Sequence, residues 1–282
     1  MMRLAVLAAV ALAVTPVPAL SAPQQAIEAQ VRWTGVPTQG GLLQASAPAG
    51  ATATLDGVAV PVAPDGRFLL GFDRDAGPQA VLVVTTRDGR TLTRNIAVAP
   101  RAWRIERLNT LPKYPAPDPV FAKLRPPELA QIVAARGRVT DADGWRQAFR
   151  WPVTGRISGQ FGAQRVYRGE PGSYHSGTDI ARPTGTVVVA PADGVVILAA
   201  ATPFSLEGNL LMLDHGMGLN SAFLHLSRID VSVGDHVRAG QPIGAVGMSG
   251  RATGPHLHWA LRWGTFKLDP VLVALPMGST AE

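Results

Sequence analysis

Short apolar runs alternate with glycine-containing turns along most of this chain. In its N-terminal third the runs lie at residues 51–55, 67–70 and 80–84. Asp-Gly dipeptides beginning at residues 56, 65 and 88 flank these runs, and such dipeptides favour tight hairpins because both residues tolerate a positive φ. We therefore predict a small all-β module, a β-sandwich, over residues 28–108, and we see no cluster of titratable side chains in it.

A second set of strand-like runs begins after Trp151. These runs lie at 186–189, 194–198, 209–213, 220–224 and 257–260, with glycine turns between them and almost no helical periodicity. The pattern is typical of an all-β core. We assign it to a C-terminal domain over residues 151–276.

The segment between the two β-rich regions contains many prolines. Six of them lie between residues 111 and 127, and proline lacks a backbone N–H donor and disfavours helix at the residue before it. We therefore expect a linker over residues 109–150 with no regular element in its proline-rich part. Its other expected features are a helix at 128–136 and a further helical turn within 141–149.

The N-terminus has the features of a secretory signal peptide over residues 1–22. Arg3 precedes an apolar run, and the small residues Ala19, Ser21 and Ala22 follow it. The run of about 16 residues is shorter than the roughly 20 that a membrane-spanning helix needs. We expect cleavage near residue 21 or 22, export across the inner membrane, and no transmembrane helix in the mature chain.

Composition narrows the possible chemistry and partners. The chain has no cysteine, so it lacks a disulfide framework and the anchor of a bacterial lipoprotein, and any metal site must use His, Asp or Glu. The formal net charge is +6 and becomes +5 without residues 1–21, which contain Arg3 and no acid. A modest positive charge suits a polyanionic neighbour such as a cell wall. The basic residues are scattered, so we expect no nucleic-acid partner.

Five residues of the C-terminal region suggest a metal site. His256 and His258 are two residues apart in a strand-like run and therefore project from the same face. His175 and Asp179 flank a glycine, and His225 ends another strand-like run. A hydrolytic zinc site needs three protein ligands and a proton acceptor that is not on the metal. His175, Asp179 and one of the pair can be the ligands, which leaves the other and His225 as helpers.

The two remaining histidines, His215 and His236, lie in turn-like segments, and we interpret them as structural. Arg165 and Arg251 lie close to the motifs and can pair with substrate carboxylates, but surface solvation explains them equally well, so we leave them out of the site.

The residues from about 155 to 274 resemble the lysostaphin-type (LytM-like) zinc metallopeptidases, which cleave peptide bonds in peptidoglycan. The matching segments occur in the family's order: HSGTD at 175–179, APADGV at 190–195, FLHLS at 223–227, VGDHVRAGQPIG at 233–244 and GRATGPHLH at 250–258. The resemblance implies that His175, Asp179 and His258 bind Zn²⁺ and that His225 and His256 assist catalysis. One departure is Thr178, where the family has a branched apolar residue, and we expect only a small effect on packing.

The resemblance also implies the function. We expect a periplasmic or cell-wall-associated, monomeric endopeptidase that hydrolyses peptide cross-links of peptidoglycan, of the D-alanyl–diaminopimelate type. The alternative is a non-catalytic LytM-like factor that binds murein and activates wall amidases. The glycines at 233–247 also resemble biotinyl and lipoyl domains, but the only lysine after Trp151 is Lys267, far from any hairpin tip that could carry the cofactor.

Overall fold

The structure is a computed structural model that describes residues 30–113 and 118–278. The expected signal peptide at 1–22 lies outside these residues. Among the helices in the described part of the chain, none combines the length and the apolar character that crossing a membrane requires.

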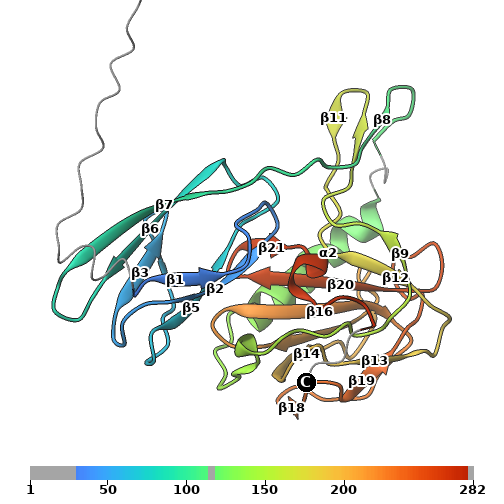
Figure 1. Ribbon diagram of the computed structural model, residues 1–282. Coiled ribbons are helices and arrows are strands. Elements are labelled where there is room, and N and C mark those ends of the chain that lie inside the picture. The colour runs from blue at the N-terminus through green and yellow to red at the C-terminus, as the bar shows by residue number, and fades with distance from the viewer. Residues whose placement is uncertain (1–29, 114–117, 279–282) are drawn as a thin grey trace, which may run out of the picture.

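The N-terminal part consists of two antiparallel sheets (Figure 1). One sheet has the order β1-β2-β5, with β1 at Arg32–Thr34, β2 at Leu42–Ser46 and β5 at Arg67–Gly71. The other has the order β4-β3-β6-β7, with β3 at Thr52–Leu55, β4 at Val58–Val60, β6 at Gln79–Thr85 and β7 at Thr91–Ala97. The predicted strands coincide with β3, β5 and β6. Asp56 and Gly57 both have positive φ, as a two-residue hairpin requires.

The C-terminal part is built on an eight-stranded sheet (Figure 1). Seven of its strands follow the order β18-β14-β15-β16-β20-β12-β9, and the eighth, β21, pairs with β20. Its strands are β9 at Arg156–Gly159, β12 at Thr178–Ala181, β14 at Gly194–Ala199, β15 at Asn209–Asp214, β16 at Leu219–Leu226, β18 at His236–Val237, β20 at His256–Trp263 and β21 at Phe266–Leu268. Two small sheets complete this part. One has the order β13-β19-β17, with β13 at Val187–Val189, β17 at Arg228–Ile229 and β19 at Pro242–Ala245. The other joins β8 at Ile105–Leu108, β10 at Gln164–Tyr167 and β11 at Glu170–Pro171. The predicted all-β class is confirmed.

The proline-rich segment differs from the prediction. Helix α2 spans Pro119–Arg136 and contains Pro126 and Pro127, so the expectation of no regular element up to residue 127 was wrong for its second half. Asp118 caps the helix by accepting hydrogen bonds from the first-turn N–H groups, and Pro119 suits the first turn because its N–H is not needed there. Interior prolines cost helix stability, so tertiary contacts must stabilise α2.

Tertiary packing of α2 supplies that stabilisation. Ile132 and Ala135 are buried in a cluster with residues of β14 and β15, among them Leu198 and Met212. The helix therefore covers one face of the large sheet. Two shorter helices follow in the chain, a 3₁₀ turn at Gly144–Arg146 and α3 at Pro270–Val273.

The N-terminal sheets are packed against the C-terminal part. One hydrophobic cluster contains Leu43 and Phe68 from the first and Leu257 and Trp259 from the second. Arg101 makes an ion pair of 2.8 Å with Asp269. The shared core and this ion pair hold the two parts together.

Candidate metal centre and active site

Three neighbouring strands of the large sheet bring the candidate residues together. In the antiparallel register Asp179 of β12 lies opposite His258 of β20, and His258 lies opposite Leu224 of β16. His225 follows Leu224 and would face the other way in a regular strand, but its positive φ breaks the alternation. Directly opposed residues project from the same face of a sheet. Leu257 and Trp259, which alternate with the histidines, are fully buried in the core, so His256 and His258 share the opposite face, as the spacing predicts.

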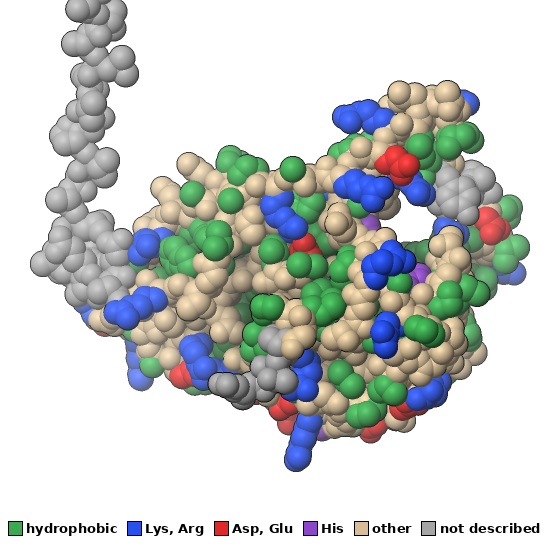
Figure 2. Space-filling view, turned by 45° about the vertical axis from the view of Figure 1, so that its right-hand side comes forward, with side chains coloured by type: hydrophobic (Ala, Val, Ile, Leu, Met, Phe, Trp, Pro, Cys, Tyr) green, Lys and Arg blue, Asp and Glu red, His purple; other side chains and the backbone are tan. Residues whose placement is uncertain are grey.

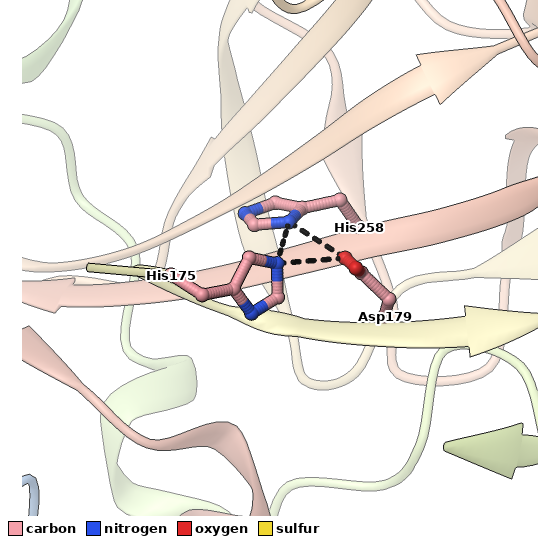
Figure 3. A group of neighbouring side chains, drawn as sticks. All are labelled: His175, Asp179 and His258. Carbon is pink, nitrogen blue, oxygen red and sulfur yellow. Dashed lines mark hydrogen bonds and ion pairs between the residues drawn. The ribbon is translucent and has the colours of Figure 1, made fainter. Parts of the chain in front are cut away.

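Three donor atoms converge at this face (Figure 3). His175 Nε2 lies 3.0 Å from Asp179 Oδ1 and 3.0 Å from His258 Nδ1, and His258 Nδ1 lies 2.8 Å from Asp179 Oδ1. A triangle with these sides has a circumradius of about 1.7 Å, below the 2.0–2.2 Å of zinc–nitrogen and zinc–oxygen bonds. A single point can therefore lie at bonding distance from all three atoms. The donor set fits a zinc ion.

The protonation of this group favours metal binding. His175 Nδ1 lies 3.0 Å from the carbonyl oxygen of Gln160, which can only accept a hydrogen bond. The proton of the neutral ring is therefore on Nδ1, and Nε2 presents its lone pair to the group. Burial opposes ionisation of Asp179, but the hydrogen bonds that His175 and His258 donate when their facing nitrogens are protonated outweigh it, and the pKa of this carboxyl lies far below its usual range. Asp179 is thus a carboxylate at neutral pH.

The pKa values of the two imidazoles move in opposite directions. Burial lowers the pKa of His175, but the hydrogen bond and charge of Asp179 outweigh this effect, so the net shift is upward. For His258 burial dominates over the hydrogen bond to Asp179, and its pKa is lowered. The Asp179 carboxylate therefore offsets the effect of burial on the pKa of His175 but not on that of His258.

Two glycines that the sequence analysis did not single out form the walls of this centre. A Cβ added at Gly159 in β9 would lie 2.1 Å from Asp179 Oδ2. A Cβ added at Gly177 would lie 2.6 Å from His258 Nε2. Gly177 belongs to the HSGTD segment, which marks it as a candidate. No local signal marks Gly159, because its role depends on the pairing of β9 with β12.

His225 and His256 lie beside the three donors. Their ring centroids are 4.8 Å apart, the His225 centroid is 6.2 Å from that of His258, and His256 Nε2 is 3.8 Å from Asp179 Oδ1. His225 Nδ1 is 2.9 Å from the carbonyl of Ser249, and His256 Nδ1 is 2.8 Å from that of Gly254. Both neutral rings therefore carry their proton on Nδ1, which leaves the Nε2 lone pairs as proton acceptors.

The environment of His225 keeps this ring neutral. Burial is the largest cause and lowers its pKa to about 4, with a smaller contribution from the nearby rings of His258 and His256, while the Ser249 carbonyl opposes the shift. The ring is therefore uncharged at neutral pH.

The other residues considered in the sequence lie outside the centre. His215 is fully buried and bonded to the Asp193 carbonyl and the Ser221 hydroxyl, and His236 is exposed near Asp141. Both observations agree with a structural role. Arg165 pairs with Glu106 at 2.8 Å, and the guanidinium of Arg251 lies over the ring of Phe121.

Thr178 is adjacent to Asp179 in β12 and therefore projects from the opposite face. It is fully buried, and no group in the described parts of the chain makes a hydrogen bond with its hydroxyl. The presence of Thr178 in place of a branched apolar residue thus affects core packing and not the three donor residues.

Comparison with known proteins agrees with this geometry. The sequence pattern of Peptidase family M23 matches residues 173–270, which include all five candidate residues. A crystal structure from Pseudomonas aeruginosa, of a protein assigned provisionally to peptidase M23, is 30% identical with a TM-score of 0.65. That match covers 84% of this chain and 94% of the other. The chain belongs to peptidase family M23, and the LytM-like resemblance is confirmed.

Curated relatives are similar over the C-terminal part. Peptidoglycan DD-endopeptidase ShyA of Vibrio cholerae is 38% identical over 147 residues, 50% of this chain and 33% of the relative. DD-carboxypeptidase/endopeptidase Mpg of Neisseria meningitidis is 42% identical over 125 residues, 43% of this chain and 27% of the relative. The match therefore spans about a third or less of each relative.

Proposed function

We propose that this protein is a zinc-dependent endopeptidase that hydrolyses peptide cross-links of peptidoglycan, of the D-alanyl–diaminopimelate type. The observation that carries the proposal is the convergence of His175, Asp179 and His258 beside two imidazoles that are not part of the donor set. The names of the two relatives, a peptidoglycan DD-endopeptidase and a DD-carboxypeptidase/endopeptidase, support the substrate class.

His175, Asp179 and His258 would hold the ion through Nε2, Oδ1 and Nδ1. Zinc in such a site, with three protein ligands, supplies an acidified water and polarises a carbonyl oxygen. The Gln160 carbonyl orients the His175 ring, and Gly159 and Gly177 leave room for the side chains of Asp179 and His258.

His225 and His256 would move the proton during hydrolysis. In the neutral form of each ring, Nδ1–H is bonded to a backbone carbonyl and the Nε2 lone pair is free. One imidazole accepts the proton of the attacking water and then donates it to the leaving amine. The other would help to hold the intermediate.

The surroundings of the centre suit an acidic polymer. Figure 2 shows histidine side chains beside a hollow that is bordered by Lys and Arg side chains. Peptide stems of peptidoglycan carry carboxylates, which such side chains attract. We further propose that residues 151–276 form the catalytic domain, that 28–108 form a small all-β module, and that the protein acts as a monomer in the periplasm or at the cell wall after cleavage of the signal peptide at 1–22.

The alternative is a non-catalytic LytM-like factor that binds murein and activates amidases. It is the weaker hypothesis, because all three donor positions and both helper positions hold competent side chains.

Purified sacculi test the proposal directly. We expect the mature protein to release peptide fragments whose masses correspond to cleaved cross-links, and Asp179→Ala to release none, as measured by mass spectrometry. His236→Ala is the matched control, since this exposed histidine lies outside the centre. Binding to sacculi without any soluble product from the wild type would contradict the peptidase proposal and favour the alternative.

Metal analysis tests the division of the histidines. His258→Ala should lose bound zinc, whereas His256→Ala should retain it and lose about 10² or more in turnover, the usual contribution of a general acid or base. Equal zinc loss in both variants would refute the assignment of His256 as a helper.

A further inference from the structure

The backbone of His225 is in an unusual conformation. Its φ of 64° lies in the left-handed region, which is costly for a residue with a Cβ. Such a conformation persists only when the surroundings hold it. His225 is accordingly held by its contacts with two loops, 204–208 and 249–251.

The first loop holds the backbone of His225 and the second holds its ring. The His225 N–H donates to the Glu207 carbonyl at 2.8 Å, and its Nδ1–H donates to the Ser249 carbonyl at 2.9 Å. The loops also contact each other tightly, since a Cβ on Gly208 would lie 2.3 Å from Ser249 Oγ. Arg251 N–H donates to the Leu206 carbonyl at 2.9 Å. A shift of either loop must therefore move His225.

Helix α2 fixes the first loop, 204–208, by side-chain contacts. Arg125 makes a bidentate pair with Glu207, with nitrogen–oxygen distances of 2.6 and 2.7 Å. Glu128 accepts hydrogen bonds of 2.5 Å from Ser205 N–H and 2.6 Å from the Ser205 hydroxyl. These side chains are little exposed, at 17% for Arg125, 10% for Glu207 and 11% for Glu128. Because these groups are paired and largely desolvated, removal of one partner would leave a buried charge unpaired, which costs more than the loss of a surface ion pair.

We propose that Arg125 and Glu207 are positioning residues for His225. Their ion pair joins the helix, which comes from the proline-rich segment, to the loop whose carbonyl holds the His225 backbone. Through these two side chains the segment positions a catalytic imidazole and is not a passive linker. The inference rests on the proposed function for the catalytic effect, but the orientation of the ring can be measured without any substrate.

Arg125→Gln removes the bidentate pair in the full-length mature chain. Lys123→Gln is the matched control, because it removes a positive charge from the same helix at an exposed side chain. We expect Arg125→Gln to keep wild-type zinc content and to lower kcat by about 10- to 100-fold, the range expected from misplacement of a catalytic group. KM should change less than about twofold, because the uniform binding of substrate is retained. Lys123→Gln should match the wild type.

A double-mutant cycle separates positioning from general destabilisation. If Arg125 acts through His225, Arg125→Gln should have little further effect on kcat in a His225→Ala background. If the loss of kcat is as large in that background as in the wild type, the proposal is refuted. Should Arg125→Gln fail to fold, Arg125→Lys keeps the charge but not the bidentate geometry, and the same cycle is run with it.

The imidazole ¹H–¹⁵N spectrum gives a readout that does not depend on turnover. In the zinc-loaded wild type we expect the His225 signals of the Nδ1–H tautomer, held by the Ser249 carbonyl. Arg125→Gln should give exchange-broadened or mixed-tautomer signals for His225 and unchanged signals for the buried His215. An unchanged His225 signal together with wild-type kcat would refute the inference. A wild type without activity on sacculi would refute the proposed function, and the spectrum would still decide the positioning claim.

Discussion

Acidification should destabilise this protein through His215. Its ring is fully buried and forms part of a chain of hydrogen bonds from Trp259 Nε1–H to the Ser221 hydroxyl, from that hydroxyl to His215 Nε2, and from His215 Nδ1–H to the Asp193 carbonyl. Protonation of Nε2 would leave the Ser221 hydroxyl without its acceptor. Burial therefore lowers the pKa of His215 to about 4 from an ordinary value of 6.5.

The magnitude follows from linkage. Because the unfolded state binds a proton more tightly than the folded state, the contribution of His215 is complete above pH 6.5 and is lost as the pH falls from 6.5 to 4. The gap between the ordinary pKa of 6.5 and about 4 corresponds to about 3 kcal/mol, most of which should be lost between pH 7.5 and pH 4.5. This is a large fraction of the 5–15 kcal/mol typical of a domain.

Urea unfolding followed by tryptophan fluorescence provides the assay. The comparison is between the wild type and His215→Asn, in which an amide N–H can still reach the Asp193 carbonyl but no group titrates. Other titrating groups cancel in the difference. We expect the stability advantage of the wild type over the variant to shrink by about 2–3 kcal/mol between pH 7.5 and pH 4.5. An advantage that stays constant over this range would refute the reasoning.

The remaining predictions concern the metal centre and its neighbours. Gly159→Ala should weaken zinc binding, because its Cβ would lie 2.1 Å from a carboxylate oxygen of Asp179. Isothermal titration would show this, and Arg156→Ala, at an exposed residue of β9, is its control. Thr178→Val should raise the free energy of unfolding by about 1 kcal/mol, since it removes a buried hydroxyl that has no partner among the described residues; a lower midpoint in urea would contradict this. Removal of zinc with a chelator should abolish hydrolysis of sacculi and lower the melting temperature, and readdition of zinc should restore both. Asp179→Ala should respond to neither treatment.

The strands and the family resemblance depend on local sequence and could be predicted from it. Apolar runs between glycine turns predict strands, because burial on a sheet follows a period of two residues and hairpins require particular backbone angles. The HSGTD and HxH segments carried the family resemblance. The same local reasoning failed at α2. Pro126 and Pro127 argue against a helix there, but contacts with the large sheet and with Glu207 stabilise it.

Only the tertiary structure determines which residues from distant segments come into contact at the site. The register of β12 against β20 places Asp179 opposite His258, and the pairing of β9 with β12 gives Gly159 its role. The tautomers of His225 and His256 follow from backbone carbonyls of loops that no spacing rule locates. The physical reason is that strand register and loop contacts depend on the packing of segments far apart in the chain, which a local pattern of residues does not contain.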